Sequence, residues 1–189
     1  MTNPFYQLAL NTIRQRLNER DTLPQVVDRI SGAAQRGKVA FYPCGRYSRI
    51  ILQEIKRQSP ELLDNIVGCF DKSRDANMEK GIGVYHISDL DNFKDSLSLL
   101  VVASNTFYAN ELRDIRENSA YDGEIFTTSR FDITIELDTE EAMRRIERIL
   151  DLLEDDKSKM TYLLIWLSRM LNDETPTYLF EPETSTADY

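Results

Sequence analysis

The stretch KVAFYPCGRYSRIILQEI, residues 38–55, decides the fold class. Residues 39–42 form an apolar run that is too short for a helix, and Pro43 and Gly45 interrupt it. Residues 48–58 then place apolar side chains at helical spacing. An apolar run, a tight turn and an amphipathic segment in this order predict a strand that leads directly into a helix.

The same alternation continues along the chain. Further apolar runs cover residues 66–70, 83–87, 97–103 and 124–126, and a second helical pattern covers residues 108–118. Strands that alternate with helices at this spacing predict a parallel sheet with right-handed crossovers. We therefore expect an α/β fold, a small Rossmann-like parallel sheet of four to five strands with helices on both faces, plus N-terminal and C-terminal helices.

The chain divides into four predicted parts. Residues 1–37 are expected to form two N-terminal helices packed on the core, and residues 38–131 the Rossmann-like domain. Residues 132–173 read as a C-terminal helical extension, which Asp138 and Glu141 open with the spacing of a capping box. Residues 174–189 contain two prolines and many polar groups, so a flexible tail is expected there.

Composition narrows the class of protein. The chain has 189 residues, of which 41% are hydrophobic, and no apolar run approaches the roughly 20 residues of a membrane span. The start of the chain lacks the pattern of a signal peptide. Its two cysteines form no C-x-x-C pair, and it has one histidine. These features predict a cytoplasmic protein with no membrane association and no metal site.

The net charge of −9 is confined to the C-terminal third of the chain. Residues 1–131 hold 17 acidic and 17 basic side chains, whereas residues 132–189 hold 15 acidic and 6 basic ones. An acidic surface repels phosphate backbones, so no nucleic-acid partner is expected. The simplest interpretation of the excess is a solvated acidic helical face.

The turn after residues 39–42 resembles the start of a nucleotide site. Dinucleotide-binding folds place G-x-G-x-x-G at this point, and the matching residues here keep only the middle glycine, Gly45. Ser48 could hydrogen-bond a phosphate, and Arg46 and Arg49 add positive charge near a helix N-terminus. A plain strand-to-helix connection is the alternative. The predicted ligand loop comprises Pro43, Cys44, Gly45, Arg46, Tyr47, Ser48 and Arg49.

Two further loops are predicted to face the same crevice. Asp71 ends the second apolar run, where an acidic side chain accepts ribose hydroxyls in this fold, although it could equally be a helix cap or turn residue. Ser104 and Asn105 end the fourth run. Because ligands gather at the carboxyl ends of parallel strands, we expect a small phosphate-bearing ligand there, a nucleotide or nucleotide-sugar. No catalytic residue is predicted, since His86 is the only histidine and falls within a predicted strand.

The successive segments FYPCGRYSRIIL, IVGCFDKS, GVYHISDL and LLVVASNTFYANELRDI resemble a known family. They are similar to the Rossmann-like domain that precedes the catalytic domain of many FkbM-type methyltransferases, and related domains occur in nucleotide-sugar-processing proteins. That family's turn has an aromatic residue, Gly-Ala-Gly, a polar pair and Thr/Ser-Arg; Tyr42, Gly45, Ser48 and Arg49 match it, whereas Pro43 departs. LLEDDKSKMTYLLIWLSRMLND resembles the helical linker to the methyltransferase, so the likeness spans residues 38–173.

This resemblance implies a non-catalytic domain that binds a nucleotide or nucleotide-sugar and is accessory to a methyltransferase or sugar-modifying enzyme. No S-adenosylmethionine motif follows in the chain, so catalysis would lie downstream or on a partner. One alternative is a protein-interaction or oligomerisation module, for example a homodimer, that uses the helix 159–171 and has a vestigial crevice. The other is a small NAD(P)-dependent nucleotide-sugar enzyme.

Overall fold

The structure is a computed structural model that describes residues 4–73, 75–76, 78, 81–104, 108–129 and 137–171. The chain separates into two compact units. One unit contains residues 21–136, and the other joins residues 1–20 to residues 137–189. The predicted tail, residues 174–189, lies outside the described residues.

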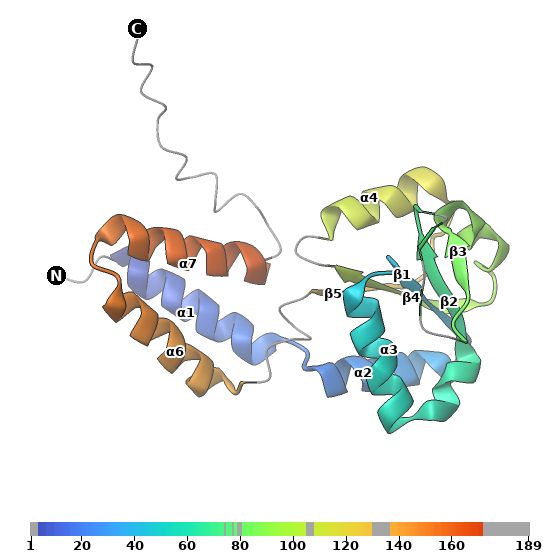
Figure 1. The fold of residues 1–189 in the computed structure, drawn as a ribbon, viewed down its shortest axis with the longest axis horizontal. Helices are drawn as coiled ribbons and strands as arrows, with labels where there is room; N and C mark the ends of the chain where they lie inside the picture. The colour runs from blue at the N-terminus through green and yellow to red at the C-terminus, as the bar shows by residue number, and fades with distance from the viewer. Residues whose placement is uncertain are drawn as a thin grey trace, which may run out of the picture. The chain divides into compact units, whose positions relative to one another are not determined.

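Residues 21–136 form an α/β unit (Figure 1). Its strands and helices alternate as the sequence predicts, with boundaries that differ by a few residues. In chain order they are α2 (Leu23–Ala34), β1 (Lys38–Tyr42), α3 (Arg46–Gln58), the 3-10 helix η1 (Pro60–Asn65), β2 (Ile66–Asp71), β3 (Val84–His86), the 3-10 helix η2 (Ile87–Asn92), β4 (Leu97–Ser104), α4 (Ala109–Asn118) and β5 (Ile125–Ser129).

The five strands form one all-parallel sheet in the order β3-β2-β1-β4-β5. Phe41 in the central strand β1 pairs with Cys69 of β2 on one side and with Val101 of β4 on the other. Helices cover both faces, with α4 on one side of the sheet and α2 and α3 on the other (Figure 1). The predicted fold class, a small Rossmann-like parallel sheet, is confirmed.

Strand side chains alternate between two buried cores. Val39 and Phe41 belong to the core under α2 and α3, together with Leu99 and Val101 of β4. Ala40 and the neighbouring β4 side chains belong to the core under α4 and η2. Both faces of the sheet are therefore shielded from water. This explains why β1 and β4 are apolar at almost every position rather than at every second one.

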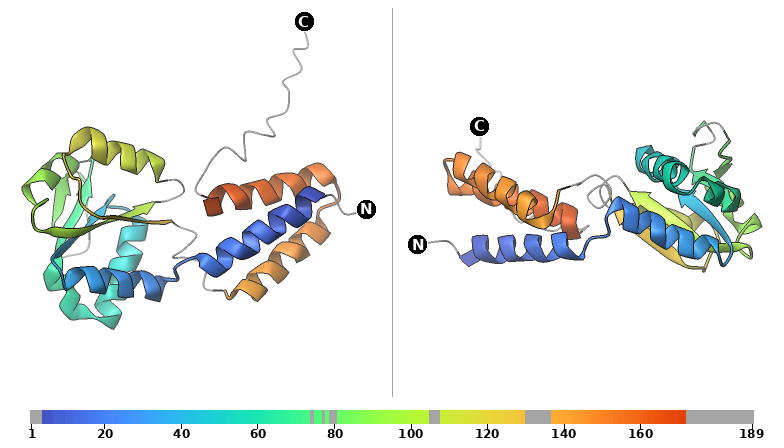
Figure 2. Two further views of the ribbon diagram at one scale, coloured as in Figure 1. Left: turned by 180° about the vertical axis from the view of Figure 1, so that it is seen from behind. Right: turned by 90° about the horizontal axis from the view of Figure 1, so that it is seen from below.

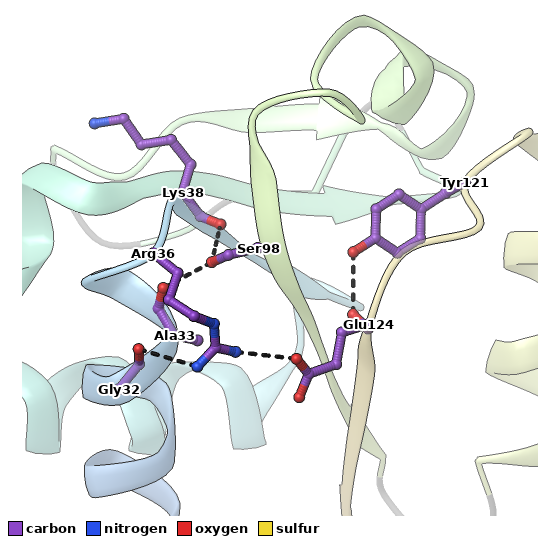
Figure 3. A network of polar contacts seen from close by, with 7 residues as sticks. All are labelled: Gly32, Ala33, Arg36, Lys38, Ser98, Tyr121 and Glu124. Carbon is purple, nitrogen blue, oxygen red and sulfur yellow. Dashed lines mark hydrogen bonds and ion pairs between the residues drawn. The ribbon is translucent and has the colours of Figure 1, made fainter.

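Polar contacts connect the end of α2 to the amino-terminal edge of the sheet (Figure 3). The Ser98 hydroxyl lies 2.8 Å from the carbonyl oxygen of Ala33, at the end of α2, and 3.0 Å from that of Lys38, in β1. The Arg36 guanidinium forms an ion pair with Glu124 at 3.0 Å, just before β5. These bonds join α2 to three strands at the edge opposite the predicted ligand loops.

The second unit consists of three helices, α1 (Pro4–Glu19), α6 (Thr139–Leu152) and α7 (Asp156–Leu171), which run side by side in Figure 2. The N-terminal helices were expected to pack on the core; α2 contributes to the core of the α/β unit, whereas α1 belongs to this three-helix unit. The buried stripe of α1, Ala9, Ile13 and Leu17, is covered by α6 and α7 instead.

The starts of α6 and α7 are set by acidic caps. Asp138 accepts a hydrogen bond from the Glu141 N–H at 2.8 Å, which confirms the predicted cap, while the Glu141 carboxylate forms ion pairs with Arg144 and Arg145. Asp155 accepts from the N–H of Ser158 at 2.8 Å, so α7 begins earlier than residue 159. None of the described helices is both long and apolar enough to cross a membrane.

Candidate functional site

The strand order reverses between β1 and β4, at the centre of the sheet. The chain leaves β1 toward β2 on one side and later returns to place β4 on the other. The helices that follow these two strands, α3 and α4, consequently cover opposite faces. In open parallel sheets such a reversal opens a crevice at the carboxyl ends of the strands. We call this region, bounded by Tyr42, Asp71 and Ser104, the carboxyl edge.

Three polar groups of the predicted ligand loop already have hydrogen-bond partners within the protein. The Gly45 N–H and the Ser48 hydroxyl both donate to the carbonyl oxygen of Pro43, each at 2.7 Å. The Cys44 N–H donates to a carboxylate oxygen of Asp71 at 2.9 Å. A glycine-rich phosphate loop points such N–H groups at its ligand instead. This loop therefore offers a ligand fewer backbone donors than a G-x-G-x-x-G turn does.

Asp71 links two loops of the carboxyl edge. One carboxylate oxygen accepts from the Cys44 N–H, and the other accepts from the Ser73 N–H at 2.9 Å. A ribose hydroxyl at this position would have to share these oxygens with the backbone. The geometry matches the turn-residue alternative for Asp71, and it places the side chain within the edge as the sequence predicts.

The first turn of α3 is the part of the loop that faces open space. Gly45, the residue before α3, has an ordinary φ of −102° and supplies no capping side chain. A Cβ atom at Gly45 would meet nothing nearer than the Pro43 ring at 4.0 Å. The Arg46 side chain is exposed and Arg49 is half-buried, so this turn carries two basic side chains. The N-terminus of α3 is accordingly accessible and electropositive.

Two residues of the predicted ligand loop belong to the core. The side chains of Cys44 and Tyr47 are only 8% and 7% exposed and belong to the core that α2 and α3 form with the sheet. A hydrogen bond between the Cys44 and Cys69 thiols, together with burial, raises the pKa of Cys69. Both cysteines are free thiols. The raised pKa of Cys69 is the opposite of the lowered pKa that marks a cysteine nucleophile.

A second polar group lies on the α4 side of the edge, and of its members sequence reasoning predicted only Ser104. The Tyr42 hydroxyl donates to Asp114 at 3.1 Å, and Lys72 forms an ion pair with the same carboxylate at 2.7 Å. The Ser104 hydroxyl donates to one oxygen of Glu111 at 3.1 Å. The spacing of Glu111 and Asp114 could have indicated this group. Residues three apart share one face of a helix, and this helix starts beside the edge.

The other carboxylate oxygen of Glu111 is unusual. It is buried and has no hydrogen-bond partner among the described residues. Leaving a buried carboxylate oxygen unpaired costs free energy. Glu111 lies next to Ser104, at the point where the strand order reverses. The carboxyl edge thus has an electropositive part at the start of α3 and an acceptor-rich part at the start of α4.

Comparisons with known proteins do not assign the chain to a family. No family model matches the chain, and neither a curated protein nor a solved structure matches it.

Asn105, the remaining predicted ligand residue, lies outside the described residues. Across the ranges that the structure describes, no three or more His, Cys, Asp or Glu side chains are grouped to hold a metal ion.

Two buried tyrosines predict a loss of stability in alkali. Burial raises the pKa of Tyr42 above its ordinary value, and the carboxylates of Asp114, Asp71 and Glu111 raise it further. Burial also raises the pKa of Tyr121 to about 12, with a smaller contribution from Glu124. In the unfolded chain these hydroxyls ionise near pH 10.

The stabilising contribution of these tyrosines is therefore complete below about pH 10 and is lost as the pH rises toward 12. We expect Tyr121 alone to lower the free energy of unfolding in urea by about 2 kcal/mol between pH 9 and pH 11.5, and Tyr42 to add to this decline. Tyr121→Phe should make this decline shallower. A decline equally steep in Tyr121→Phe would assign the effect to other groups.

Proposed function

We propose that the α/β unit binds a nucleotide or nucleotide-sugar at the carboxyl edge, between the starts of α3 and α4. The unpartnered oxygen of Glu111 carries this proposal. A sugar or ribose hydroxyl is a neutral donor that would satisfy this oxygen without a proton transfer. A plain strand-to-helix connection would not require a buried carboxylate oxygen that lacks a hydrogen-bond donor.

The phosphate of the same ligand would bind at the first turn of α3. The N-terminus of a helix offers N–H groups and a positive dipole end to an anion. Arg46 adds a charged side chain there, and the missing side chain of Gly45 leaves room for close approach. Because the N–H groups of Cys44 and Gly45 already donate to Asp71 and Pro43, we favour one or two phosphates at the helix over a dinucleotide pyrophosphate along the loop.

The accessory role rests on the resemblance to domains that precede FkbM-type methyltransferases. In this role the domain holds the ligand, and a methyltransferase or sugar-modifying enzyme performs the chemistry. The titratable side chains of the edge support a non-catalytic function. Tyr42 has a raised pKa and is therefore a poor proton donor or acceptor near neutral pH.

Calorimetric titration of the full chain tests the proposal. The probes are UDP, UDP-glucose, GDP-mannose and ADP, with uridine as the ligand that lacks phosphate. We expect at least one phosphate-bearing probe to bind with a Kd below the millimolar range. Uridine should bind at least about tenfold more weakly, because it lacks the phosphate that would bind at the N-terminus of α3.

Gly45→Trp provides the matching variant. The substitution fills the space in front of α3, yet Gly45 needs no special backbone conformation and its Cβ would touch nothing closely. We expect an unchanged Tm and a Kd raised at least about tenfold. Gly32→Trp, at an equally open glycine on α2, is the control and should bind normally. If every probe binds only above the millimolar range and Gly45→Trp changes nothing, the site does not exist.

A further inference from the structure

Two thiols are in contact inside the α/β unit. Cys44 lies in the loop after β1, and Cys69 lies within β2. Both are free cysteines, and the hydrogen bond between them, ahead of burial, is the largest cause of the raised pKa of Cys69. A hydrogen bond raises a thiol pKa when it holds the protonated form, so Cys69 is the donor and the Cys44 sulfur is the acceptor. A single buried cysteine is ordinary core packing, whereas two sulfurs in contact can react with an oxidant as a pair.

The paths of β1 and β2 bring the two thiols together. Phe41 of β1 pairs with Cys69. Three residues later the Cys44 N–H donates to Asp71 at 2.9 Å, so the loop after β1 reaches the end of β2. Cys69 and Asp71 are two residues apart in a strand and therefore share one face of the sheet. Both cysteine side chains belong to the core that α2 and α3 cover, so the backbone places the two sulfurs on the same side independently of their own hydrogen bond.

The two cysteines differ in their access to solvent. Cys44 is 8% exposed, whereas Cys69 is fully buried. A small oxidant such as hydrogen peroxide therefore meets Cys44 first. This difference assigns a separate step to each sulfur.

We propose that Cys44 and Cys69 form a modification site at which hydrogen peroxide produces an intramolecular disulfide. In the first step the deprotonated Cys44 sulfur attacks one peroxide oxygen, the O–O bond breaks and hydroxide leaves, so that Cys44 becomes a sulfenic acid. In the second step the Cys69 sulfur attacks the Cys44 sulfur, the S–O bond breaks, and the oxygen leaves as water with the Cys69 proton. The two thiols lose two electrons and two protons, and the peroxide is reduced to two molecules of water.

The second step does not require Cys69 to ionise in advance. Its proton moves to the departing sulfenic oxygen as the S–S bond forms. The existing hydrogen bond already directs the Cys69 S–H toward the Cys44 side chain. Since the two sulfurs are in contact, rotation of the side chains can bring them to bonding distance.

The disulfide would join the loop after β1 to β2 beside the hydrogen bond from Cys44 to Asp71. This loop continues through Gly45 into α3. Oxidation therefore restricts the opening of the loop. We expect amide hydrogen exchange at Cys44 and Gly45 to slow at least about fivefold on oxidation, and exchange within β1 to stay unchanged. The inference is independent of the proposed ligand.

Peptide mapping of the oxidised full chain tests the proposal. Trypsin releases Cys44 in the peptide 39–46 and Cys69 in the peptide 58–72, and neither contains methionine, which peroxide also oxidises. After treatment with hydrogen peroxide and blocking of free thiols, we expect the two peptides to be joined and about 2 Da lighter than their sum. Dithiothreitol should return both peptides to their separate masses.

Alanine variants test the order of the two steps. Cys69→Ala leaves the Cys44 sulfenic acid without its partner, so dimedone should label this variant after peroxide treatment. Cys44→Ala should be labelled at least about fivefold less, because Cys69 is fully buried. Circular dichroism checks that both variants remain folded, and the mapping of the parent chain depends on neither of them.

Three results would overturn the proposal. Thiols that stay free while the methionines of the same chain gain oxygen exclude the reaction. Disulfides between two chains, in place of the joined peptides within one chain, show that the cysteines do not react with each other. Addition of oxygen to Cys44 in the parent chain without a disulfide shows that Cys69 does not carry out the second step.

Discussion

Gly68→Ala is expected to destabilise the α/β unit by about 4 kcal/mol, the largest effect of any single change considered for this protein. Gly68 lies in β2 with a φ of +151°, a conformation that side chains with a Cβ rarely adopt. An added Cβ would collide with the carbonyl oxygen of Gly83 and would lie 2.9 Å from the Tyr85 ring. The Gly83 carbonyl cannot simply move, because it accepts a hydrogen bond from the Cys69 N–H at 2.9 Å.

The local register of the sheet explains why glycine is needed there. Val39 of β1 pairs with Ile66, but the next residue, Ala40, pairs with Gly68, so β2 contains one extra residue at this point. Some bulges require a glycine with positive φ, and Gly68 has such a φ. The cost of alanine therefore combines backbone strain with a steric collision.

Urea unfolding followed by circular dichroism measures this effect, and hydrogen exchange of the β2 amides locates it. Gly32→Ala is the matched control. Gly32 lies within α2 with nothing within 4 Å of its added Cβ, so alanine should stabilise the helix by about 0.5–1 kcal/mol. The same substitution is thus expected to act in opposite directions at two glycines. Equal stabilities of Gly68→Ala and the parent would show that β2 does not adopt this bulge.

The fold was predictable because its cause is local and repeated. Residues 39–42 and 97–103 are apolar throughout, and each leads into an amphipathic helix, so the pattern specifies strands covered on both faces. The packing partner of α1 was not predictable in this way. Its stripe of Ala9, Ile13 and Leu17 fits any apolar surface, and the surface that covers it comes from residues more than a hundred positions later.

The candidate site was predictable in position but not in detail. Topology alone brings the ends of β1, β2 and β4 to one edge, so the placement of Asp71 and Ser104 follows from the strand order. The partners of their polar atoms do not follow from it. Whether Asp71 binds a ligand or the Cys44 N–H depends on the path of one short loop, and Glu111 became noticeable through an unpaired oxygen that no sequence pattern records.

Asp71→Ala is expected to cost about 3 kcal/mol of unfolding free energy and to loosen the ligand loop. The substitution removes two charge-assisted hydrogen bonds, to the N–H groups of Cys44 and Ser73. These bonds join the loop after β1 to the loop after β2, and the Cys44 side chain is buried, so its N–H would be left without its acceptor. We therefore expect amide hydrogen exchange at Cys44 and Ser73 to accelerate more than at the strand amides of β1.

Asp71→Asn separates the two roles considered for this residue. Asparagine keeps one acceptor oxygen but presents an N–H₂ group where the second backbone donor lies, so it should recover at most half of the lost stability. If Asp71 only holds the loops together, the Kd for a nucleotide probe should rise in step with the acceleration of exchange at Cys44. If Asp71 also binds ribose, Asp71→Asn should weaken UDP more than it loosens the loop. Exchange and stability unchanged from the parent in Asp71→Ala would show that the two bonds do not hold the loop.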